Sequence, residues 1–276
     1  MALELAQHFF ASLPELRFHP TAKRIRAFAD GDVVVDSTRA WIVWEPRRVV
    51  PSYAVPLDDI HGALRESQAA TADEAAVQLG DGPPVLDRRT GFSFHTAPGH
   101  AFDITVARST LAAAVFVPSD PDFEGRAIVD FAAFNEWLEE DELLVGHARD
   151  PFKTIDTRRS SRRVVVEIAG ITVADSTRTT MLFETHLPTR FYFLRDDVRM
   201  DLLDRSDTVS VCAYKGHATY WSANLGDKAV IPDVAWSYEH PHNYAIAVKD
   251  MLTFFNERVD ITLDGQPLER PRTPWS

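Results

Sequence analysis

Glu184 is the residue in this sequence best suited to acid–base chemistry, because it directly follows the apolar run Met181-Leu182-Phe183. A carboxylate after such a run either emerges at the end of a strand or is partly buried with a partner. Alternate residues of a strand share a face, which predicts that Glu184 and His186 share a pocket as candidate acid and base. The alternative is a structural ion pair between Glu184 and Arg178 or Arg190.

A second glutamate, Glu45, follows the apolar run Trp41-Ile42-Val43-Trp44 in the first half of the chain. Arg47 and Arg48 come soon after it and could bind a carboxylate or phosphate of a ligand in bidentate fashion. We favour the alternative, in which these two arginines carry surface charge or form a salt bridge between domains.

Cys212 and Lys215 flank a short segment that ends at Gly216. A thiol near an ammonium group can have a lowered pKa and act as a nucleophile. Cys212, however, follows Val209 and Val211 in an expected strand, and free cysteine is among the most buried residue types. We therefore expect Cys212 to be structural or to line a pocket, and Lys215 to be exposed and to face a ligand.

Aromatic residues are concentrated in the second half of the chain. A sheet lined by aromatic rings with a few polar tips is typical of sites for small apolar or ring-bearing ligands, although ordinary core packing explains some of these residues. The aromatic candidates for ligand contact are Tyr192, Tyr214, Tyr220, Trp221 and Trp236. The sequence thus predicts a pocket in the second half that contains Glu184, Tyr192 and Lys215.

The sequence lacks the residue patterns that binding of a metal ion or a cofactor requires. Cys212 is the single cysteine, which excludes a disulfide and every paired-cysteine zinc site. Asp30-Gly31-Asp32 lies at an expected hairpin tip, where these residues are ordinary turn formers. Asp58-Asp59 and Asp196-Asp197 are adjacent pairs, which point to opposite faces when extended. We expect neither a metal nor a cofactor.

The composition limits the setting and the partners. The chain has 276 residues, of which 45% are hydrophobic and 25% charged, and a formal net charge of −12. An acidic chain disfavours nucleic acid, and no apolar run approaches the ~20 residues that cross a bilayer. Residues 1–10 lack the basic start of a secretory signal. We expect a cytoplasmic monomer or homodimer that binds a small molecule, with no nucleic-acid or membrane partner.

The two halves of the sequence carry similar motifs in the same order. Asp36-Ser37-Thr38-Arg39 recurs as Asp175-Ser176-Thr177-Arg178, and Tyr53 is matched by Tyr192. A preserved order predicts a duplicated domain. The expected parts are an N-terminal helical extension (1–16), a first repeat domain (17–150) with an inserted loop (65–89), and a second repeat domain (151–276), with the boundary in a solvated linker at 146–161.

Within each half the dominant hydrophobic period is two, which is typical of strands. Hairpin turns are predicted at Asp30-Gly31 and Ala169-Gly170, because glycine accepts a positive φ. A helix is predicted in each half from apolar residues at helical spacing, namely Val248, Met251, Leu252 and Phe255, and Ile128, Phe131, Phe134 and Leu138. The predicted fold is mainly β, with two tandem domains, each a curved antiparallel sheet or open barrel with one C-terminal helix.

Several motifs of the second half resemble the domain of unknown function 427 family. They are Glu184, Phe191-Tyr192-Phe193, Ser206-Asp207-Thr208, Cys212-Ala213-Tyr214-Lys215-Gly216, Tyr220-Trp221 and Ala235-Trp236-Ser237-Tyr238. The resemblance extends from about Arg163 to Val259 and, in part, over the first half, which implies a tandem two-copy member. The sequence departs from the family pattern at Ala213, where proline is usual, and at residues 95–100, which replace the Cys-Pro-aromatic-Lys-Gly stretch.

The resemblance leaves the function open, although the family sometimes carries a nucleotidyltransferase label. Nucleotidyl transfer needs either carboxylates spaced to hold a metal ion or a glycine-rich loop that binds phosphates. We keep it as a minor alternative on the family label alone. One hypothesis is a metal-independent enzyme in which Glu184 or His186 is the acid or base and Lys215 or Tyr192 orients the substrate. The other is a non-catalytic ligand-binding or protein-interaction module that uses the same pocket.

Overall fold

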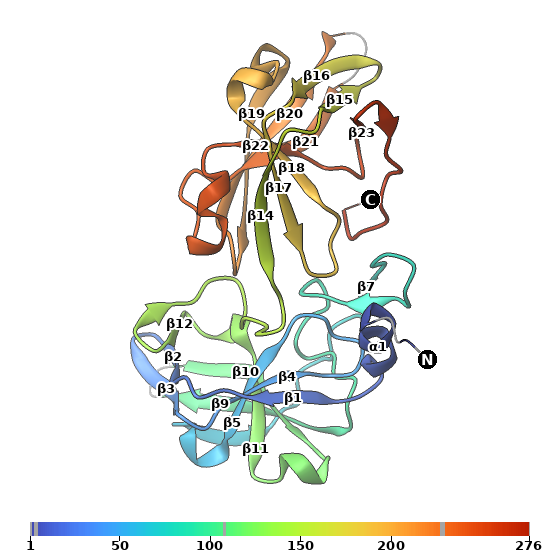
Figure 1. Ribbon diagram of the computed structural model, residues 1–276. Helices are drawn as coiled ribbons and strands as arrows, with labels where there is room; N and C mark the ends of the chain where they lie inside the picture. The colour runs from blue at the N-terminus through green and yellow to red at the C-terminus, as the bar shows by residue number, and fades with distance from the viewer. Residues whose placement is uncertain (1, 3–4, 107–108, 227–229, 276) are drawn as a thin grey trace. The chain divides into compact units, whose positions relative to one another are not determined.

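The computed structural model describes residue 2 and residues 5–106, 109–226 and 230–275 (Figure 1). The chain divides into two compact units, of which the first comprises Met1–Val77 and Gly82–Asp150, and the second Gln78–Asp81 and Pro151–Ser276. The named strands of both units pair in antiparallel fashion. The predicted mainly β, antiparallel fold is therefore confirmed. None of the helices in the described ranges has the length and apolar character that crossing a bilayer requires.

The first unit begins with helix α1 (Leu5–Ser12) and contains two main sheets. Its strands are β1 (Arg17–Pro20), β2 (Ile25–Ala29), β3 (Asp32–Ser37), β4 (Trp41–Trp44), β5 (Ser52–Pro56), β6 (Ala63–Glu66), β9 (Gly99–Val106), β10 (Ser109–Pro118), β11 (Arg126–Val129), β12 (Glu136–Glu139) and β13 (Glu142–Leu143). The seven-stranded sheet has the order β1-β4-β5-β11-β10-β9-β6, and the four-stranded sheet the order β13-β12-β2-β3. The expected loop at 65–89 contains a short hairpin of β7 (Ala76–Val77) and β8 (Val85–Leu86).

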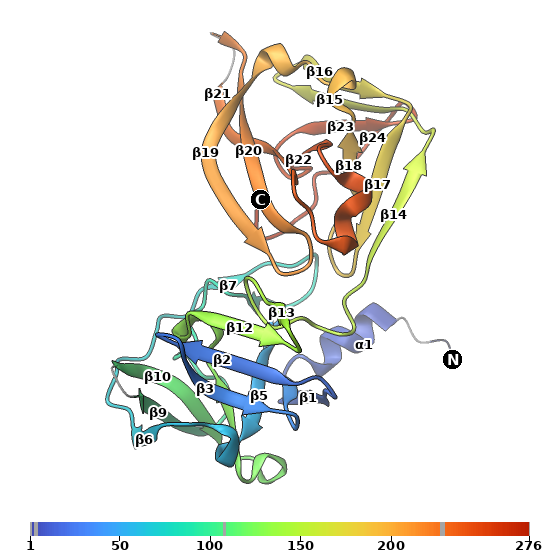
Figure 2. The ribbon, with the colours of Figure 1, turned by 90° about the vertical axis from the view of Figure 1, so that its left-hand side faces the viewer.

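The second unit also has a seven-stranded and a four-stranded sheet. Its strands are β14 (Ile155–Ser160), β15 (Val164–Ile168), β16 (Ile171–Ser176), β17 (Thr179–Glu184), β18 (Arg190–Phe193), β19 (Leu203–Cys212), β20 (Gly216–Asn224), β21 (Val230–Ser237), β22 (Leu252–Phe254), β23 (Asp260–Leu263) and β24 (Gln266–Pro267). The orders are β14-β17-β18-β22-β21-β20-β19 and β16-β15-β23-β24. The large sheet curves between its end strands β14 and β19, which do not pair with each other (Figure 2).

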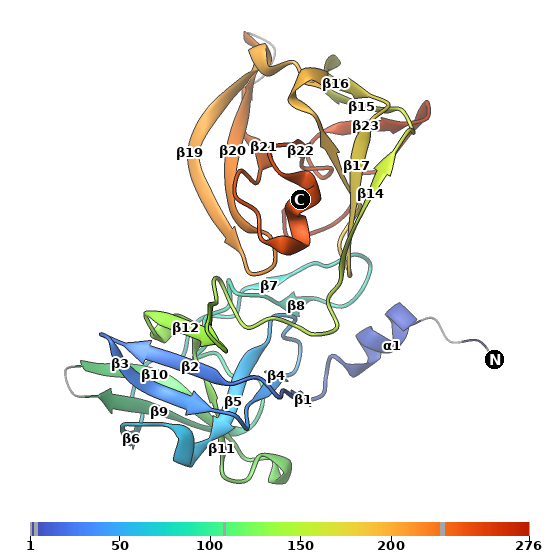
Figure 3. The ribbon, with the colours of Figure 1, turned by 60° about the vertical axis from the view of Figure 1, so that its left-hand side comes forward.

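Apolar side chains on the two faces of the large sheet form two cores in the second unit. Phe191 and Phe254 pack into the core that also contains residues of the four-stranded sheet. Leu182 and Tyr192 belong to the other core, which is covered by the 3-10 segment Asn243–Val248. Figure 3 shows this segment enclosed between β20 and β17. Strand alternation therefore decides which core a residue of β17, β18 or β22 enters.

The helix predicted near the end of each half is not formed. In the second unit the 3-10 segment ends at Val248 and strand β22 follows, while residues 126–139 of the first unit hold β11, a 3-10 turn (Phe131–Ala133) and β12. Met251 packs into one core of the second unit, whereas Leu252 packs into the other. A short strand buried on both faces is a continuous apolar run, and such a run also fits helical spacing.

The linker expected over residues 146–161 is only partly a connection. The chain passes from the first unit to the second between Asp150 and Pro151. Residues 155–160, however, form strand β14, which pairs along its whole length with β17. The basic residues Arg158 and Arg159 within this range favoured a solvated linker, but they lie on β14, where the Arg158 side chain is 67% exposed. Charged side chains on a strand at the end of a sheet satisfy that pattern equally well.

Candidate functional site

Glu184 forms the buried centre of a group of charges in the second unit. It is the last residue of β17, and its side chain is only 5% exposed. The Oε1 atom lies 3.0 Å from Nζ of Lys153, and Oε2 accepts a hydrogen bond from Nζ of Lys215. We call Lys153, Glu184 and Lys215 the charge cluster.

The partners expected for Glu184 from the sequence make other ion pairs. Arg178 binds the carboxylate of Asp197, with a shortest distance of 2.6 Å. Arg190 binds Glu257 through two hydrogen bonds of 2.7 Å each, and both side chains are buried. The structural ion pair was thus expected with the wrong cation, because the two lysines approach from segments distant in sequence.

Each lysine reaches Glu184 from a loop next to the sheet. Lys153 lies just before β14, the strand that pairs with β17. Lys215 lies in the turn between β19 and β20, where its carbonyl accepts a hydrogen bond from the backbone N–H of His242 at 3.1 Å. The next residue, Gly216, has a φ of 96°, and a Cβ there would lie 3.1 Å from the His242 ring. Glycine therefore allows the turn that directs Lys215 inward.

Glu184 and Lys215 are both ionised at neutral pH. Burial by itself raises the pKa of Glu184, but the ammonium groups of Lys215 and Lys153 outweigh burial and lower that pKa to about 2. Burial lowers the pKa of Lys215, but the carboxylate of Glu184, together with nearby Cys212, reverses the effect and raises it. Two ammonium groups face one carboxylate, so the charge cluster carries one surplus positive charge.

Tyr192 lies beside the charge cluster and is fully buried. Burial raises its pKa to about 12, against smaller opposing contributions from Lys215 and the indole of Trp236. The hydroxyl makes no hydrogen bond of normal geometry to any residue that the structure describes. An unsatisfied buried hydroxyl costs free energy, so a polar group that entered this region would find a partner in Tyr192.

Several other predicted residues lie on this side of the sheet. Tyr220 and Trp236 pack with Tyr192 in one core. The ring of Tyr214 lies 5.7 Å from Nζ of Lys153, within the range of a cation–π contact. Cys212 is half-buried at the end of β19. The structure thus gathers most of the predicted aromatic residues near the charge cluster.

Three expectations for individual residues are wrong. Lys215, expected to be exposed, is 8% exposed, because its ammonium group turns inward to Glu184. His186 does not continue the alternation of Glu184, because β17 ends at Glu184 and His186 is an exposed turn residue with a φ of 63°. Trp221 lies on the other face of the sheet, in the core that contains Phe191.

Glu45 in the first unit follows β4 as Glu184 ends β17, but its partners differ. Its side chain is 3% exposed, and the carboxylate accepts hydrogen bonds from the backbone N–H groups of Thr96 at 2.9 Å and Ala97 at 3.3 Å. Nδ1 of His95 lies 3.1 Å from Oε1, and Nε of Arg48 lies 3.7 Å from it. A single loop therefore supplies most of the groups that bind Glu45.

The two arginines after Glu45 bind groups of the first unit. Arg47 pairs with Glu74 at 2.6 Å. Arg48 donates hydrogen bonds to the carbonyl groups of Gly91 at 2.8 Å and Phe94 at 2.7 Å, and burial lowers its pKa. The guanidinium of Arg48 thus fixes the loop that carries the partners of Glu45.

The match between Tyr53 and Tyr192 is corrected by the strand register. In the first unit Tyr53 of β5 pairs with Ile42 of β4, and in the second unit Phe191 of β18 pairs with Met181 of β17. Tyr53 therefore corresponds to Phe191, and the next residue, Ala54, corresponds to Tyr192. The connection between the two strands is one residue shorter in the second unit, which shifts the alignment of motifs. The first unit therefore has no tyrosine at the place of Tyr192.

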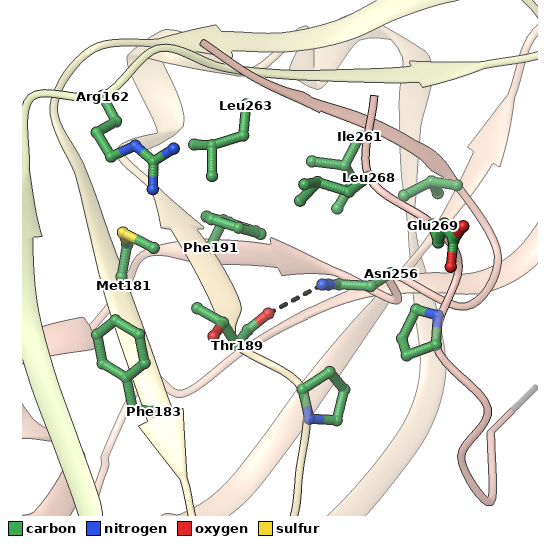
Figure 4. Close-up of a pocket in the computed structure, with 13 residues that line it drawn as sticks. Arg162, Met181, Phe183, Thr189, Phe191, Asn256, Ile261, Leu263, Leu268 and Glu269 are labelled. Atoms are coloured by element: carbon green, nitrogen blue, oxygen red, sulfur yellow. Dashed lines mark hydrogen bonds between the residues drawn. The ribbon is translucent and has the colours of Figure 1, made fainter. Parts of the chain in front are cut away.

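A hollow of about 420 Å³ opens on the face of β17 and β18 that is opposite to Glu184 and Tyr192 (Figure 4). None of the site residues predicted from the sequence lines it. Its apolar lining includes Met181, Phe183, Phe191, Ile261, Leu263 and Leu268. Arg162 and Glu269 also line it, and the amide of Asn256 donates a hydrogen bond to the carbonyl of Thr189 there. Sequence reasoning missed this hollow because it followed only the face of β17 that carries Glu184. The available signal was the apolar pair Met181 and Phe183 on the other face.

Residues 156–265 match the model of a domain of unknown function (DUF427). The matched segment runs from β14 to the turn after β23, so it includes Glu184, Lys215 and most of the lining of the hollow. The resemblance noted in the sequence is thereby confirmed for this segment. No curated protein matched the chain. Among the described residues, no group of three or more His, Cys, Asp or Glu side chains could hold a metal ion.

Proposed function

We propose that the second unit is a small-molecule-binding module whose charge cluster binds an anionic group of the ligand. The observation that carries the proposal is the surplus positive charge on Lys153, Glu184 and Lys215. Burying a net charge is costly unless it is paired, so a ligand carboxylate or phosphate would be stabilised here. The side chain of Lys153 is 24% exposed, whereas that of Lys215 is 10% exposed, which makes Lys153 the point of access.

Tyr192 supports the same proposal from a second direction. Its hydroxyl is buried, uncharged at neutral pH and without a hydrogen-bond partner of normal geometry in the described part of the chain. A ligand oxygen that enters beside Lys153 and Lys215 could accept this hydrogen bond. Tyr192 would then add orientation to the charge attraction.

The charge states favour binding over acid–base catalysis. A general acid or base works best when its pKa lies near the operating pH. The pKa of Glu184 is lowered to about 2, and that of Lys215 is raised from an already high ordinary value. Neither group exchanges a proton near neutrality, so the enzyme hypothesis has less support than the non-catalytic module.

We also infer that the first unit is a diverged copy of the matched domain, which makes the chain a tandem two-copy member. The large sheets of the two units have the same strand order relative to the sequence, as do their four-stranded sheets. The repeated Asp-Ser-Thr-Arg motif makes the same contacts, since its serine donates a 2.6 Å hydrogen bond to Asp59 in the first unit and to Asp197 in the second. Such shared detail is difficult to obtain without common descent.

Calorimetric titration with inorganic phosphate and with malonate tests the proposed function. We expect Lys153→Met to weaken binding by about tenfold or more, because a charge-assisted hydrogen bond is lost. Lys153→Arg should retain most of the affinity, and Lys249→Met, which removes an exposed lysine of the same unit, should retain all of it. Binding that is absent from the unaltered protein, or that is unchanged by Lys153→Met, would contradict the proposal.

A further inference from the structure

We propose that the hollow of the second unit is a separate binding site for an aromatic carboxylate. It lies on the face of β17 and β18 opposite to Glu184 and Tyr192, so it does not depend on the charge cluster. Its volume of about 420 Å³ falls within the range of ligand pockets. The first unit fills the same place with its own side chains, and these side chains indicate the class of ligand.

Strand register identifies the residues that correspond in the two units. Strand β2 pairs with β12, and β15 pairs with β23. Both β2 and β15 have a β-bulge after their third residue, Ala27 and Val166. Ala27 pairs with Trp137, and Val166 pairs with Ile261. Trp137 therefore occupies the place of Ile261.

The indole of Trp137 fills the core of the first unit at this place. Its side chain is one of the largest fully buried ones, and it stacks on Phe131 at 5.0 Å between ring centroids and an interplanar angle of 7°. Its ring also lies 5.6 Å from that of Tyr53, the counterpart of Phe191. The second unit has the smaller Ile261 in place of the indole. An aromatic ring above Phe191 would restore the missing packing.

A carboxylate accompanies the indole in the first unit. Glu139, two residues after Trp137, lies 2.8 Å from Nζ of Lys23 and accepts a hydrogen bond of 3.3 Å from the hydroxyl of Tyr53. By the same register, Leu263 takes the place of Glu139 in the second unit. The second unit thus lacks both an aromatic ring and a carboxylate at neighbouring positions, and one ligand could supply both.

Arg162 provides the cation for this carboxylate. It lies two residues before β15, as Lys23 lies two residues before β2. Its Nε donates a hydrogen bond to Asp264 at 2.6 Å, and no described residue accepts a hydrogen bond from its terminal Nη groups. Figure 4 shows the guanidinium directed toward Met181 and Leu263, into the hollow. A guanidinium binds a carboxylate with two parallel hydrogen bonds.

The remaining lining limits the ligand to a single acidic group. Glu269 is the second charged residue of the lining, and Figure 4 shows it on the other side of the hollow from Arg162. A ligand with a second carboxylate on that side would be repelled. Phe183 is 40% exposed and Leu268 37% exposed, so both offer apolar surface that a ring could cover. The structure therefore favours a ring with one carboxylate on a short arm.

Binding of indole-3-acetate, followed by calorimetry, tests this inference. Indole-3-acetamide keeps the ring without the charge, and acetate keeps the charge without the ring. We expect the acid to bind best, the amide to bind about tenfold more weakly, and acetate to show no binding at this site. No binding of indole-3-acetate at millimolar concentration would refute the proposal.

Two substitutions locate the site. Ile261→Trp introduces the side chain of the first unit and should abolish binding. Arg162→Met should weaken binding of the acid by about tenfold and leave that of the amide unchanged, and it gives a result even if Ile261→Trp does not fold. Arg159→Met, which removes an exposed charge from β14, is the matched control. Affinity for the acid that survives both Ile261→Trp and Arg162→Met would overturn the assignment.

Lys153→Met separates this inference from the proposed function. It alters the charge cluster on the opposite face, so it should leave the affinity for indole-3-acetate unchanged while it weakens phosphate binding. Loss of indole-3-acetate binding in this variant would place the ligand at the charge cluster and refute a separate site. Failure of phosphate to bind, with indole-3-acetate still dependent on Arg162, would refute the proposed function alone.

Discussion

Glu45 and Glu184 stand at corresponding strand ends in the two units, but their negative charges are met in different ways. Backbone N–H groups of one loop bind Glu45, together with His95. Two lysine side chains from separate loops bind Glu184. Backbone donors satisfy a carboxylate without adding a full charge, whereas two lysines overcompensate it. A glutamate at this position of the fold can thus be bound mainly by backbone groups, or by two lysines that leave a surplus positive charge.

The hollow gives a second contrast between the units. Trp137 fills the first unit where Ile261 leaves space in the second, and Glu139 gives way to Leu263. In the first unit, backbone N–H groups and side chains of the unit bind the carboxylate of Glu45, and the side chain of Trp137 fills the core. In the second unit, the charge cluster keeps one surplus positive charge and the hollow is not filled by a side chain. Both proposals of function therefore concern the second unit.

Loss of the carboxylate at the two strand ends should have the largest effect. Glu184→Gln leaves the buried ammonium group of Lys215 and the partly exposed one of Lys153 without their counter-charge, and should cost about 3–5 kcal/mol of unfolding free energy. Glu45→Gln keeps an oxygen that accepts from the backbone and should cost about 1 kcal/mol. Urea unfolding of the two variants measures the difference. Equal losses would mean that the two carboxylates are held in the same way.

The pH dependence of stability should show the same contrast. The pKa of Glu184 falls from its ordinary value of 4.5 to about 2 on folding, so its contribution is complete above pH 4.5 and is lost as the pH falls toward 2. The shift corresponds to about 3 kcal/mol. Unfolding free energies measured between pH 2.5 and 7 should fall with acid in the unaltered protein and less steeply in Glu184→Gln. Parallel curves for the two proteins would argue against ionised Glu184 as the source.

Lys215 acts on the alkaline side with the opposite sign. Its pKa is raised on folding, so its contribution is complete below its ordinary value of 10.5 and is lost only at higher pH. Together the contributions of Glu184 and Lys215 predict a plateau of stability between pH 4.5 and 10.5. A Lys215→Met variant should lose less stability on further alkalinisation than the unaltered protein does.

Exchange of the residues at the hollow should have an intermediate effect. Trp137→Ile opens a cavity in the first unit and should cost about 2–4 kcal/mol, because large-to-small changes lose both transfer energy and packing. Ile261→Trp places its ring in existing space and should cost less. Thermal unfolding of both variants compares them. A loss in Ile261→Trp as large as that in Trp137→Ile would show that the hollow cannot accept a ring.

Removal of two tyrosine hydroxyls should have the smallest effect and sharpens the contrast furthest. Tyr192→Phe removes a hydroxyl that makes no hydrogen bond of normal geometry to any described residue, and it should change stability by less than about 0.5 kcal/mol. Tyr53→Phe removes the hydrogen bond to Glu139 and should cost about 1 kcal/mol. Chemical denaturation resolves this difference. A clear loss in Tyr192→Phe would mean that its hydroxyl has a partner in the folded protein.

Much of the fold could be predicted from local patterns, because hairpins depend on adjacent residues. The turns at Asp30-Gly31 and Ala169-Gly170 form as predicted, with positive φ values at all four residues. The helix at Val248 to Phe255 was wrong, because a strand between two cores has no polar face to reveal its period. Local pattern thus identifies strands reliably only where one face meets solvent.

The candidate site was predictable in its residues but not in its contacts. Glu184, Tyr192 and Lys215 were predicted to share one pocket, and the structure places these side chains close together, while their role as a binding site stays a prediction. Lys153 was missed, because no spacing in the sequence links it to a residue so far along the chain. The inward turn of Lys215 depends on the approach of His242 to Gly216, which is a tertiary contact.

The open edges of the second large sheet have a consequence for how the protein behaves at high concentration. Strands β14 and β19 are the end strands of this sheet in the described part of the chain, and such edges can recruit strands of other molecules into aggregates. Arg158 and Arg159 project from β14, and Asp204, Arg205 and Asp207 project from β19. Charged side chains at an edge oppose such recruitment, so we expect these residues to slow fibril growth. Neutral substitutions there should leave the fold intact and shorten the time before aggregates form.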